Sequence, residues 1–300
     1  MYYKYTRIIL LKLLNRVWKY IREIDVNVIT ENVAKLCIDS NIYLNDDIKK
    51  ALEKSLAQEK ESLPKNILDV LIKNSEIAKE ELKPICQDTG MAIIYVDVGM
   101  DVHFKGGSLT EAINKGVALG YKGGYLRKSV VNDPLERKNT NDNIPAIIHY
   151  NIVEGDKVKI VVAPKGFGSE NMGKIAMLPP SAGIDGIKKF VYDTIKLAGA
   201  NACPPMIVGI GIGGNMEKCV DIAKRALLRE VGSKNSDERL QKLEEELLEG
   251  INKMNIGPSG FGGKTTALCV HINMYATHIT SLPVCVCTGC HATRHREIIL

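Results

Sequence analysis

A change of pattern near residue 83 constrains the fold of this 300-residue chain most strongly. Between Thr30 and Leu82, apolar residues recur at steps of three and four, which is typical of amphipathic helices. Thr30 and Asn45 are expected to be N-caps of two of these helices. Beyond residue 83, short apolar or alternating runs predict strands over 91–99, 146–153 and 156–164.

The rest of the chain mixes the two patterns. Glu154 and Gly155 are expected to form the turn that joins the second and third of these strands. Helices are predicted over 184–197, 216–231 and 236–252, and further strands over 206–212, 266–276 and 283–287. Helices come first, and strands and helices then follow without strict βαβ alternation. The sequence therefore predicts an α+β fold with a helical N-terminal part.

Positive charge is concentrated at the start of the chain. Residues 1–24 hold six Lys or Arg against one Glu, which accounts for the whole net charge of +5. Their apolar residues have helical spacing, so a membrane-surface helix or a docking arm is possible, but a poorly ordered or partner-covered extension is favoured. Lys12 and Arg16 interrupt the apolar run, which disfavours a transmembrane span or a cleaved signal. We expect a basic extension over 1–24 and one catalytic domain over 25–300, whose balanced charge argues against nucleic-acid binding.

Two glycine-rich loops resemble nucleotide-binding motifs. Residues 209–214 satisfy G-x-G-x-x-G, but no parallel βαβ partner precedes them, so a tight turn or close backbone packing is the favoured interpretation. Residues 257–266 miss the phosphate-loop pattern because Pro258 stands where its first glycine is required, and an apolar, strand-like run follows. Nucleotide hydrolysis is therefore disfavoured. Another kind of anion-binding loop, with Lys264 as the cation, remains open.

The eight cysteines are scattered and follow no convincing secretory signal, which indicates a reducing compartment and a cytoplasmic location. Cys287, Cys290 and His291 fit C-x-x-C-H, but nothing else supports haem attachment, and a zinc site would need a second ligand pair. Cys285 and Cys287 alternate in an apolar run and should share one buried face. The cysteines expected to act as small core residues are Cys37, Cys219 and Cys269.

Cys86, Cys203 and Cys290 differ from the others because Gly, Pro or polar residues flank each of them in a predicted loop. Three thiolates from distant loops suit a [4Fe–4S] cluster that leaves one iron without a protein ligand. Such an iron can act as a Lewis acid. Two other functions compete with an enzyme that uses this iron as a Lewis acid. One is an electron-transfer iron–sulfur protein with Cys287 as fourth ligand, and the other is a non-enzymatic scaffold protein.

Six stretches of the chain together resemble the motifs of a known protein family: "KPICQDTGMAIIYVDVG", "LRKSVVNDPL", "KGFGSENM", "ANACPPMIVGIGIGGN", "GPSGFGGKTTALCVHINMYATHITSLPV" and "GCHATRH". From about Val26 onward the chain resembles the alpha subunit of the iron–sulfur hydro-lyases, the class I fumarases and L-tartrate dehydratases. The resemblance implies reversible loss of water from a small hydroxy-dicarboxylate. It favours fumarate hydration to malate, with L-tartrate dehydration as the alternative. It also implies a hetero-oligomer with a beta subunit that carries the family's smaller domain.

The resemblance also assigns roles to single residues. It agrees that the cluster ligands are Cys86, Cys203 and Cys290. Asp88 is expected to exchange a proton with the leaving or entering water, unless it only caps a turn. The expected substrate contacts are Gln87 through its amide, Arg127 through its guanidinium, the backbone N–H near Gly168, and His278. A surface ion pair is the competing role for Arg127, and a core position for His278. The base for the carbon-bound proton is expected on the partner.

Overall fold

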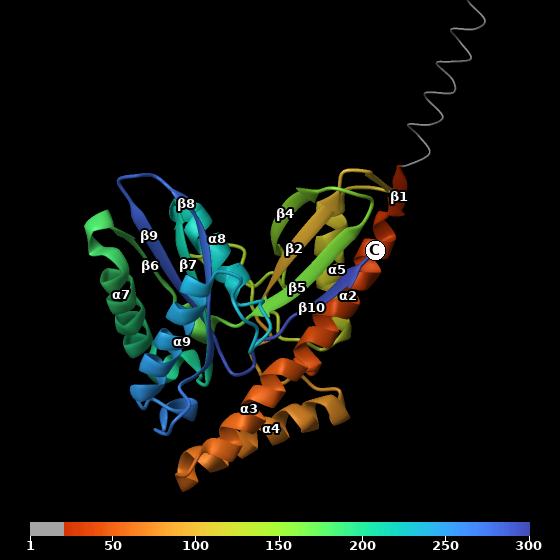
Figure 1. The fold of residues 1–300 in the computed structure, drawn as a ribbon. Coiled ribbons are helices and arrows are strands. Elements are labelled where there is room, and N and C mark those ends of the chain that lie inside the picture. Colours follow the sequence, from red (N-terminus) through yellow and green to blue (C-terminus); the bar gives the residue numbers. More distant parts are fainter. Residues whose placement is uncertain (1–20) are drawn as a thin grey trace, which may run out of the picture. The chain divides into compact units, whose positions relative to one another are not determined.

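The computed structural model describes residues 21–300 and groups them into two compact units, which Figure 1 draws as a ribbon. Among the described residues, the first unit comprises 21–40, 89–164 and 295–300, and the second comprises 41–88 and 165–294. Helices and mixed sheets confirm the predicted α+β fold. Most of the expected extension lies outside the described residues, so the division into 1–24 and 25–300 stays a prediction.

A four-stranded sheet forms the framework of the first unit. Two helices, α2 (Val26–Ile42) and α5 (Leu109–Gly123), contribute apolar side chains to the same core as the sheet. A short parallel pair, β1 (Arg22–Asp25) with β3 (Val102–Lys105), completes the unit. The sheet runs in the order β10 (Arg296–Ile299), β5 (Val158–Lys165), β2 (Met91–Gly99) and β4 (Ile147–Val153).

The N-cap prediction for Thr30 is wrong. Thr30 lies inside α2, where its buried hydroxyl donates to the carbonyl oxygen of Ala112 at 3.0 Å. The helix begins earlier because β1 ends at Asp25, whose carboxylate accepts the backbone N–H of Asn27 at 2.8 Å. Asn45 does stand at the N-cap of α3 (Asp46–Gln58), although its side chain makes no capping hydrogen bond.

The expected turn at Glu154 and Gly155 does not join two paired strands. β4 pairs with β2 in parallel, and β2 lies between β4 and β5. The end of β2 lies between β4 and the segment that leads into β5. The N–H of Gly99 donates to Lys157 O at 2.8 Å, and that of Met100 donates to Val153 O at 2.9 Å. A Cβ added to Gly99 would lie 2.3 Å from Gly155 O, so only glycine fits at this crossing.

The second unit is built on another four-stranded sheet with helices on both faces. Side chains of α7 (Gly183–Ala198) and α9 (Glu238–Lys253) share a core with one face. The other face packs with α8 (Met216–Ala226), α3 and α4 (Ser62–Glu81). The sheet order is β6 (Lys174–Leu178), β9 (Leu282–Gly289), β7 (Met206–Gly214) and β8 (Ala267–Thr277).

Close packing explains the G-x-G-x-x-G motif, as expected. β7 lies so close to α8 that a Cβ on Gly209 would be 2.4 Å from Ala223 O, and one on Gly211 would be 2.1 Å from Cys219 O. The two glycines therefore let a helix backbone contact the strand directly.

The second glycine loop encloses a carboxylate of the chain itself. The backbone N–H of Lys264 donates to Oε2 of Glu59 at 2.7 Å, and those of Lys60 and Glu61 donate to Oε1 at 2.8 and 3.1 Å. Burial alone would raise the pKa of Glu59, but these N–H groups outweigh it and lower the pKa. The loop thus uses the Lys264 N–H to bind an internal anion, and it leads into β8 as predicted.

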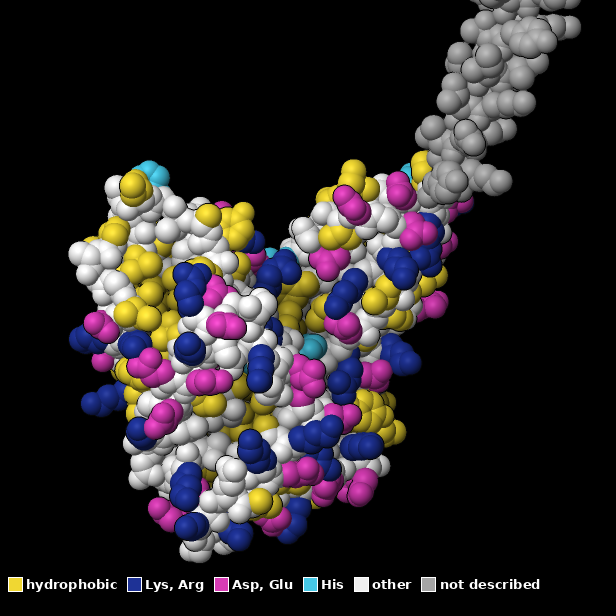
Figure 2. Space-filling model, in the orientation of Figure 1, with side chains coloured by type: hydrophobic (Ala, Val, Ile, Leu, Met, Phe, Trp, Pro, Cys, Tyr) yellow, Lys and Arg dark blue, Asp and Glu magenta, His cyan; other side chains and the backbone are white. Residues whose placement is uncertain are grey.

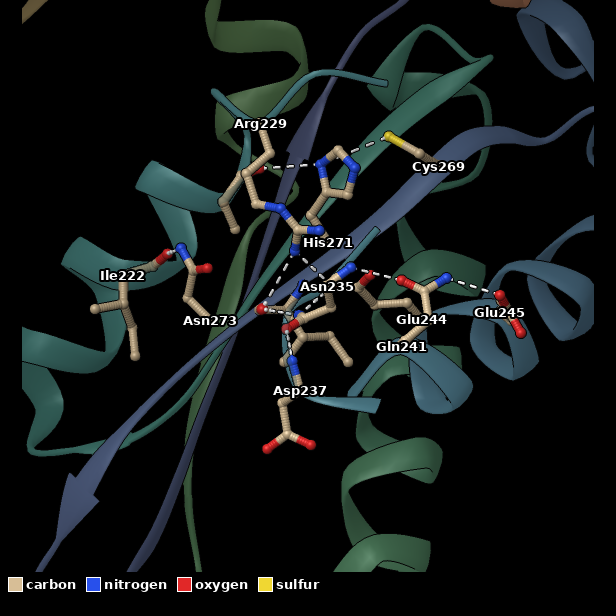
Figure 3. A network of polar contacts seen from close by, with 12 residues as sticks. Ile222, Arg229, Asn235, Asp237, Gln241, Glu244, Glu245, Cys269, His271 and Asn273 are labelled. Atoms are coloured by element: carbon tan, nitrogen blue, oxygen red, sulfur yellow. Dashed lines mark hydrogen bonds and ion pairs between the residues drawn. The ribbon is translucent and has the colours of Figure 1, made fainter. Parts of the chain in front are cut away.

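A buried polar network ties α9 to β8 (Figure 3). Oε1 of Glu244 accepts hydrogen bonds from Arg229 Nη1, Asn235 Nδ2 and Ile272 N at 2.6, 2.8 and 2.7 Å. His271, almost fully buried, lies beside it with Nδ1 3.2 Å from Ala226 O. Burial and the nearby charge of Arg229 lower the pKa of His271.

Charges of both signs share the surface. Figure 2 shows Lys and Arg side chains intermixed with Asp and Glu side chains over the visible face. This distribution matches the balanced composition of residues 25–300. Among residues 21–300, no helix has both the length and the apolar character that crossing a membrane requires.

Candidate active site

Solvent accessibility separates the eight cysteines into the two classes that the sequence predicts. Cys203 is exposed, and Cys86 and Cys290 are partly exposed. Cys285 and Cys287 share a buried face of β9, with their sulfur atoms 3.8 Å apart. The other buried thiols belong to Cys37, Cys219 and Cys269. The loop cysteines are therefore exposed or partly exposed, whereas the cysteines of helices and strands are buried.

Cys86 lies in the loop that follows α4. The residue before it, Ile85, is held by two hydrogen bonds: its N–H donates to Asn41 O at 2.9 Å, and its carbonyl accepts from Asn74 Nδ2 at 2.8 Å. Ile85 is buried in a small apolar cluster with Ala292. These anchors fix the backbone on which the Cys86 thiol stands, and the N–H of Asp88 points at its sulfur over 3.4 Å.

Cys203 and Cys290 occupy two further loops that contact each other. Cys203 precedes β7 in a left-handed backbone conformation, with φ 53°. Its carbonyl accepts from the backbone N–H of His291 at 3.1 Å, and Nδ1 of His291 lies 3.1 Å from the same oxygen. Cys290 follows the end of β9, and its carbonyl accepts from Thr293 Oγ1 at 2.7 Å. Cys290 and Cys86 also pack against one apolar cluster, so the three loops converge.

The three thiols influence one another electrostatically. Burial raises the pKa of Cys86, opposed by the Asp88 N–H and the charge of Arg294. Burial also raises the pKa of Cys203, and the negative charges of Cys290 and Cys86 raise it further. A negative charge on one thiol raises the pKa of its neighbours. The thiols therefore lose their protons most readily when a bound cation balances the charge.

Asp88 is fixed beside these thiols by a short helix, α6 (Phe167–Glu170). The backbone N–H of Phe167 donates to Asp88 Oδ2 at 2.8 Å. A Cβ added to Gly166 would lie 3.2 Å from that oxygen, and one added to Gly168 would lie 4.0 Å from the sulfur of Cys203. The structure therefore brings the predicted residues Cys86, Asp88, Gly168, Cys203 and Cys290 together within the second unit.

Sequence reasoning missed Arg294, which joins two of these loops. Its side chain is buried, and it donates to Asp88 O at 2.6 Å, to Ala292 O at 2.8 Å and to Asn41 Oδ1 at 3.1 Å. The guanidinium thus ties the Asp88 loop to the segment that carries Cys290. An arginine four residues after a candidate ligand was the only signal in the sequence.

The remaining predicted residues are placed differently. Gln87 follows Cys86, whose S–H donates to Gln87 Oε1 at 3.4 Å. Arg127 belongs to the first unit, where its carbonyl accepts from Thr89 Oγ1 at 3.0 Å. His278 lies in the exposed turn between β8 and β9, with Nδ1 2.8 Å from Thr280 Oγ1.

His278 is consequently distant from the cysteine loops within this chain. β9 has eight residues between that turn and Cys290, and at roughly 3.3 Å per residue this is about 26 Å. The structure does not bring His278 together with the thiols. The substrate roles of Gln87, Arg127, Gly168 and His278 stay predictions.

Comparison with known proteins places the chain in a family. The sequence model of the family described as fumarate hydratase (Fumerase) matches residues 30–299. A Methanocaldococcus jannaschii protein, provisionally described as L(+)-tartrate dehydratase subunit alpha, is 41% identical over 272 residues, covering 89% of this chain and 95% of the relative. The L(+)-tartrate dehydratase alpha subunits of Escherichia coli K12 and Shigella sonnei are each 32% identical over 278 residues, covering 92% of this chain and 91% of the relative. The chain therefore belongs to the fumarate hydratase (Fumerase) family of hydro-lyases, in which its relatives are alpha subunits.

Proposed function

We propose that this chain is the cluster-bearing alpha subunit of an L-tartrate dehydratase. The observation that carries the proposal is the Asp88 carboxylate anchored beside three accessible thiols. The relatives' names support tartrate better than fumarate, which was the leading expectation from the sequence. Both reactions break a C–O bond on one carbon and a C–H bond on its neighbour. Tartrate carries one more hydroxyl than malate, so its dehydration gives the enol of oxaloacetate.

Three thiols from three separate loops are the donor set that a [4Fe–4S] cluster with one open iron requires. Within residues 21–300, no group of three or more His, Cys, Asp or Glu side chains is placed to hold a single metal ion. We assign Cys86, Cys203 and Cys290 as the ligands. When bound, a cluster with three protein ligands supplies a Lewis acid for the departing hydroxyl.

In this proposal Asp88 donates a proton to the departing hydroxyl. Hydroxide is a poor leaving group, so a nearby acid must give it a proton as the C–O bond breaks. The hydrogen bond from Phe167 fixes the orientation of the Asp88 carboxyl group, and Arg294 fixes its backbone. In the reverse direction the same carboxylate accepts a proton from the entering water.

Three of the other predicted residues hold the substrate in this proposal. The guanidinium of Arg127 offers two parallel donors that match a carboxylate. Gln87 offers an amide donor, and the segment at Gly168 offers a backbone N–H. His278 is not assigned to the substrate, because the length of β9 separates it from Cys290. The base that takes the carbon-bound proton lies on a beta subunit, in agreement with the description of the relatives as alpha subunits.

The position of the Cys287 thiol disfavours the electron-transfer alternative. That function needs a fourth cysteine ligand. Cys287 is only 6% exposed and packs in the sheet core beside Cys285. This position favours a three-thiol site, and hence the hydro-lyase.

Anaerobic turnover by the chain together with its beta subunit tests the proposal. L-Tartrate and malate are offered separately, and oxaloacetate or fumarate is measured. We expect kcat/KM for L-tartrate to exceed that for malate by at least about tenfold, the ratio that 1.4 kcal/mol of differential binding produces. Turnover of malate alone would contradict the tartrate assignment and restore fumarate hydration. Turnover of neither acid by the fully loaded complex would contradict the hydro-lyase proposal for this chain.

A further inference from the structure

A largely buried ionic cluster adjoins the segment 166–170, whose Phe167 N–H binds Asp88. Glu170, the last residue of α6, forms ion pairs with the ammonium groups of Lys165 at 3.5 Å and of Lys224. Only 11% of the Lys165 side chain is exposed, against 27% for Glu170 and 18% for Lys224. Two cations around one carboxylate leave one positive charge uncompensated within the cluster.

The buried ammonium group of Lys165 binds the segment 166–170. It donates to Ser169 Oγ at 2.7 Å and to Gly166 O at 3.2 Å. Gly166 is the N-cap of the helix whose first N–H, that of Phe167, binds Asp88. Three charge-assisted contacts from one ammonium group therefore fix both ends of the segment.

The same segment is tied to β9, the strand that leads to Cys290. The hydroxyl of Thr288, a buried residue two positions before Cys290, donates to Ser169 O at 2.8 Å. Burial lowers the pKa of Lys165, and the charge of Glu170 opposes that shift.

Resting on the function proposed above, we propose that Lys165 is a positioning residue of the active site. It holds the 166–170 segment so that the Phe167 N–H orients Asp88. Nothing in the chemistry of water loss requires a lysine at this position, so its role is distinct from those of Asp88 and the thiols. A lysine that served only to stabilise the whole fold would not protect the 166–170 segment selectively.

Hydrogen exchange in the cluster-free full-length chain tests the positioning role. Lys165→Met should speed amide exchange over 166–170 by about tenfold or more, because hydrogen bonds to a charged group are lost. Lys165→Arg retains a cation and should restore most of the protection. Ser169→Ala removes one contact and should give a smaller increase, which keeps the test valid if Lys165→Met fails to fold. The matched control is Lys188→Met, which removes a cation of α7 that pairs with Glu246.

Turnover with the beta subunit adds a second readout. Lys165→Met should lower kcat more than it raises KM, because the orientation of Asp88 is lost, whereas Lys165→Arg and Lys188→Met should leave both constants near those of the wild type.

The outcomes separate this inference from the proposed function. Unchanged exchange in both Lys165→Met and Ser169→Ala would overturn the positioning role, even in an active enzyme. A wild-type chain that takes up no cluster would overturn the proposed function, whereas the exchange measurement would still decide the positioning role.

Discussion

The backbone N–H of Phe167 donates a 2.8 Å hydrogen bond to Asp88 Oδ2, although 79 positions separate the two residues in the sequence. The bond joins the loop of one candidate ligand, Cys86, to the helix that faces another, Cys203. It gives a carboxylate a fixed orientation beside three thiols. General acid–base catalysis requires this arrangement, because proton transfer depends on geometry before it depends on acidity.

Replacing Asp88 should separate catalysis from cluster binding. Asp88→Asn keeps an oxygen that can accept the Phe167 N–H but cannot exchange the proton. We expect kcat of the complex to fall by about 10²- to 10⁴-fold with iron content unchanged. Asp193→Asn, which alters an exposed carboxylate paired with Lys189, is the control and should retain wild-type kcat. A wild-type kcat in Asp88→Asn would remove the acid–base role.

Removing the Arg294 side chain should weaken the fold at the site. Arg294→Met keeps the apolar stem but loses three hydrogen bonds to Asn41, Ala292 and Asp88. We expect a loss of about 3 kcal/mol in the free energy of unfolding, measured by denaturant titration of the cluster-free chain. The exposed Arg239→Met should change it by no more than about 0.5 kcal/mol. Equal effects of the two substitutions would show that Arg294 contributes no special support.

The buried His271 should make stability depend on pH. Its folded-state pKa is lowered by burial and by Arg229, so the unfolded chain binds the proton more readily. Stability contributed by the neutral ring is therefore intact above the unfolded pKa of 6.5 and is lost as pH falls below it. Between pH 7.5 and 5.5, the wild type should lose up to about 1.4 kcal/mol more than His271→Gln. Denaturant unfolding at both pH values measures this difference, and identical losses would contradict a neutral buried ring.

Much of the candidate site was predictable because the neighbours of a cysteine in the sequence indicate whether it lies in a loop or in the core. Gly, Pro or polar neighbours marked Cys86, Cys203 and Cys290 as loop residues, and these are the accessible thiols. Alternation marked Cys285 and Cys287 as core residues, and both are buried. Strand and helix patterns also located β2, β7, β8 and α7 to within a few residues.

Long-range pairings were not predictable in the same way. Glu154 and Gly155 read as a hairpin turn because short-range signals cannot show that β2 inserts between the neighbouring strands. Arg294 and Lys165 carry no local sign of burial, since their partners stand far away in the sequence or in an unpredicted helix. Such residues become visible only when the loops are seen together.

The most direct test of the account is the iron and sulfide content of the anaerobically reconstituted chain and its cysteine variants. A [4Fe–4S] site predicts about four irons and four sulfides in the wild type. Cys86→Ser, Cys203→Ser and Cys290→Ser should each lose the cluster, because each removes one of three ligands. Cys285→Ser and Cys287→Ser should retain it, because both thiols belong to the sheet core. Full cluster content in Cys203→Ser, or loss of the cluster in Cys287→Ser alone, would contradict the three-thiol site.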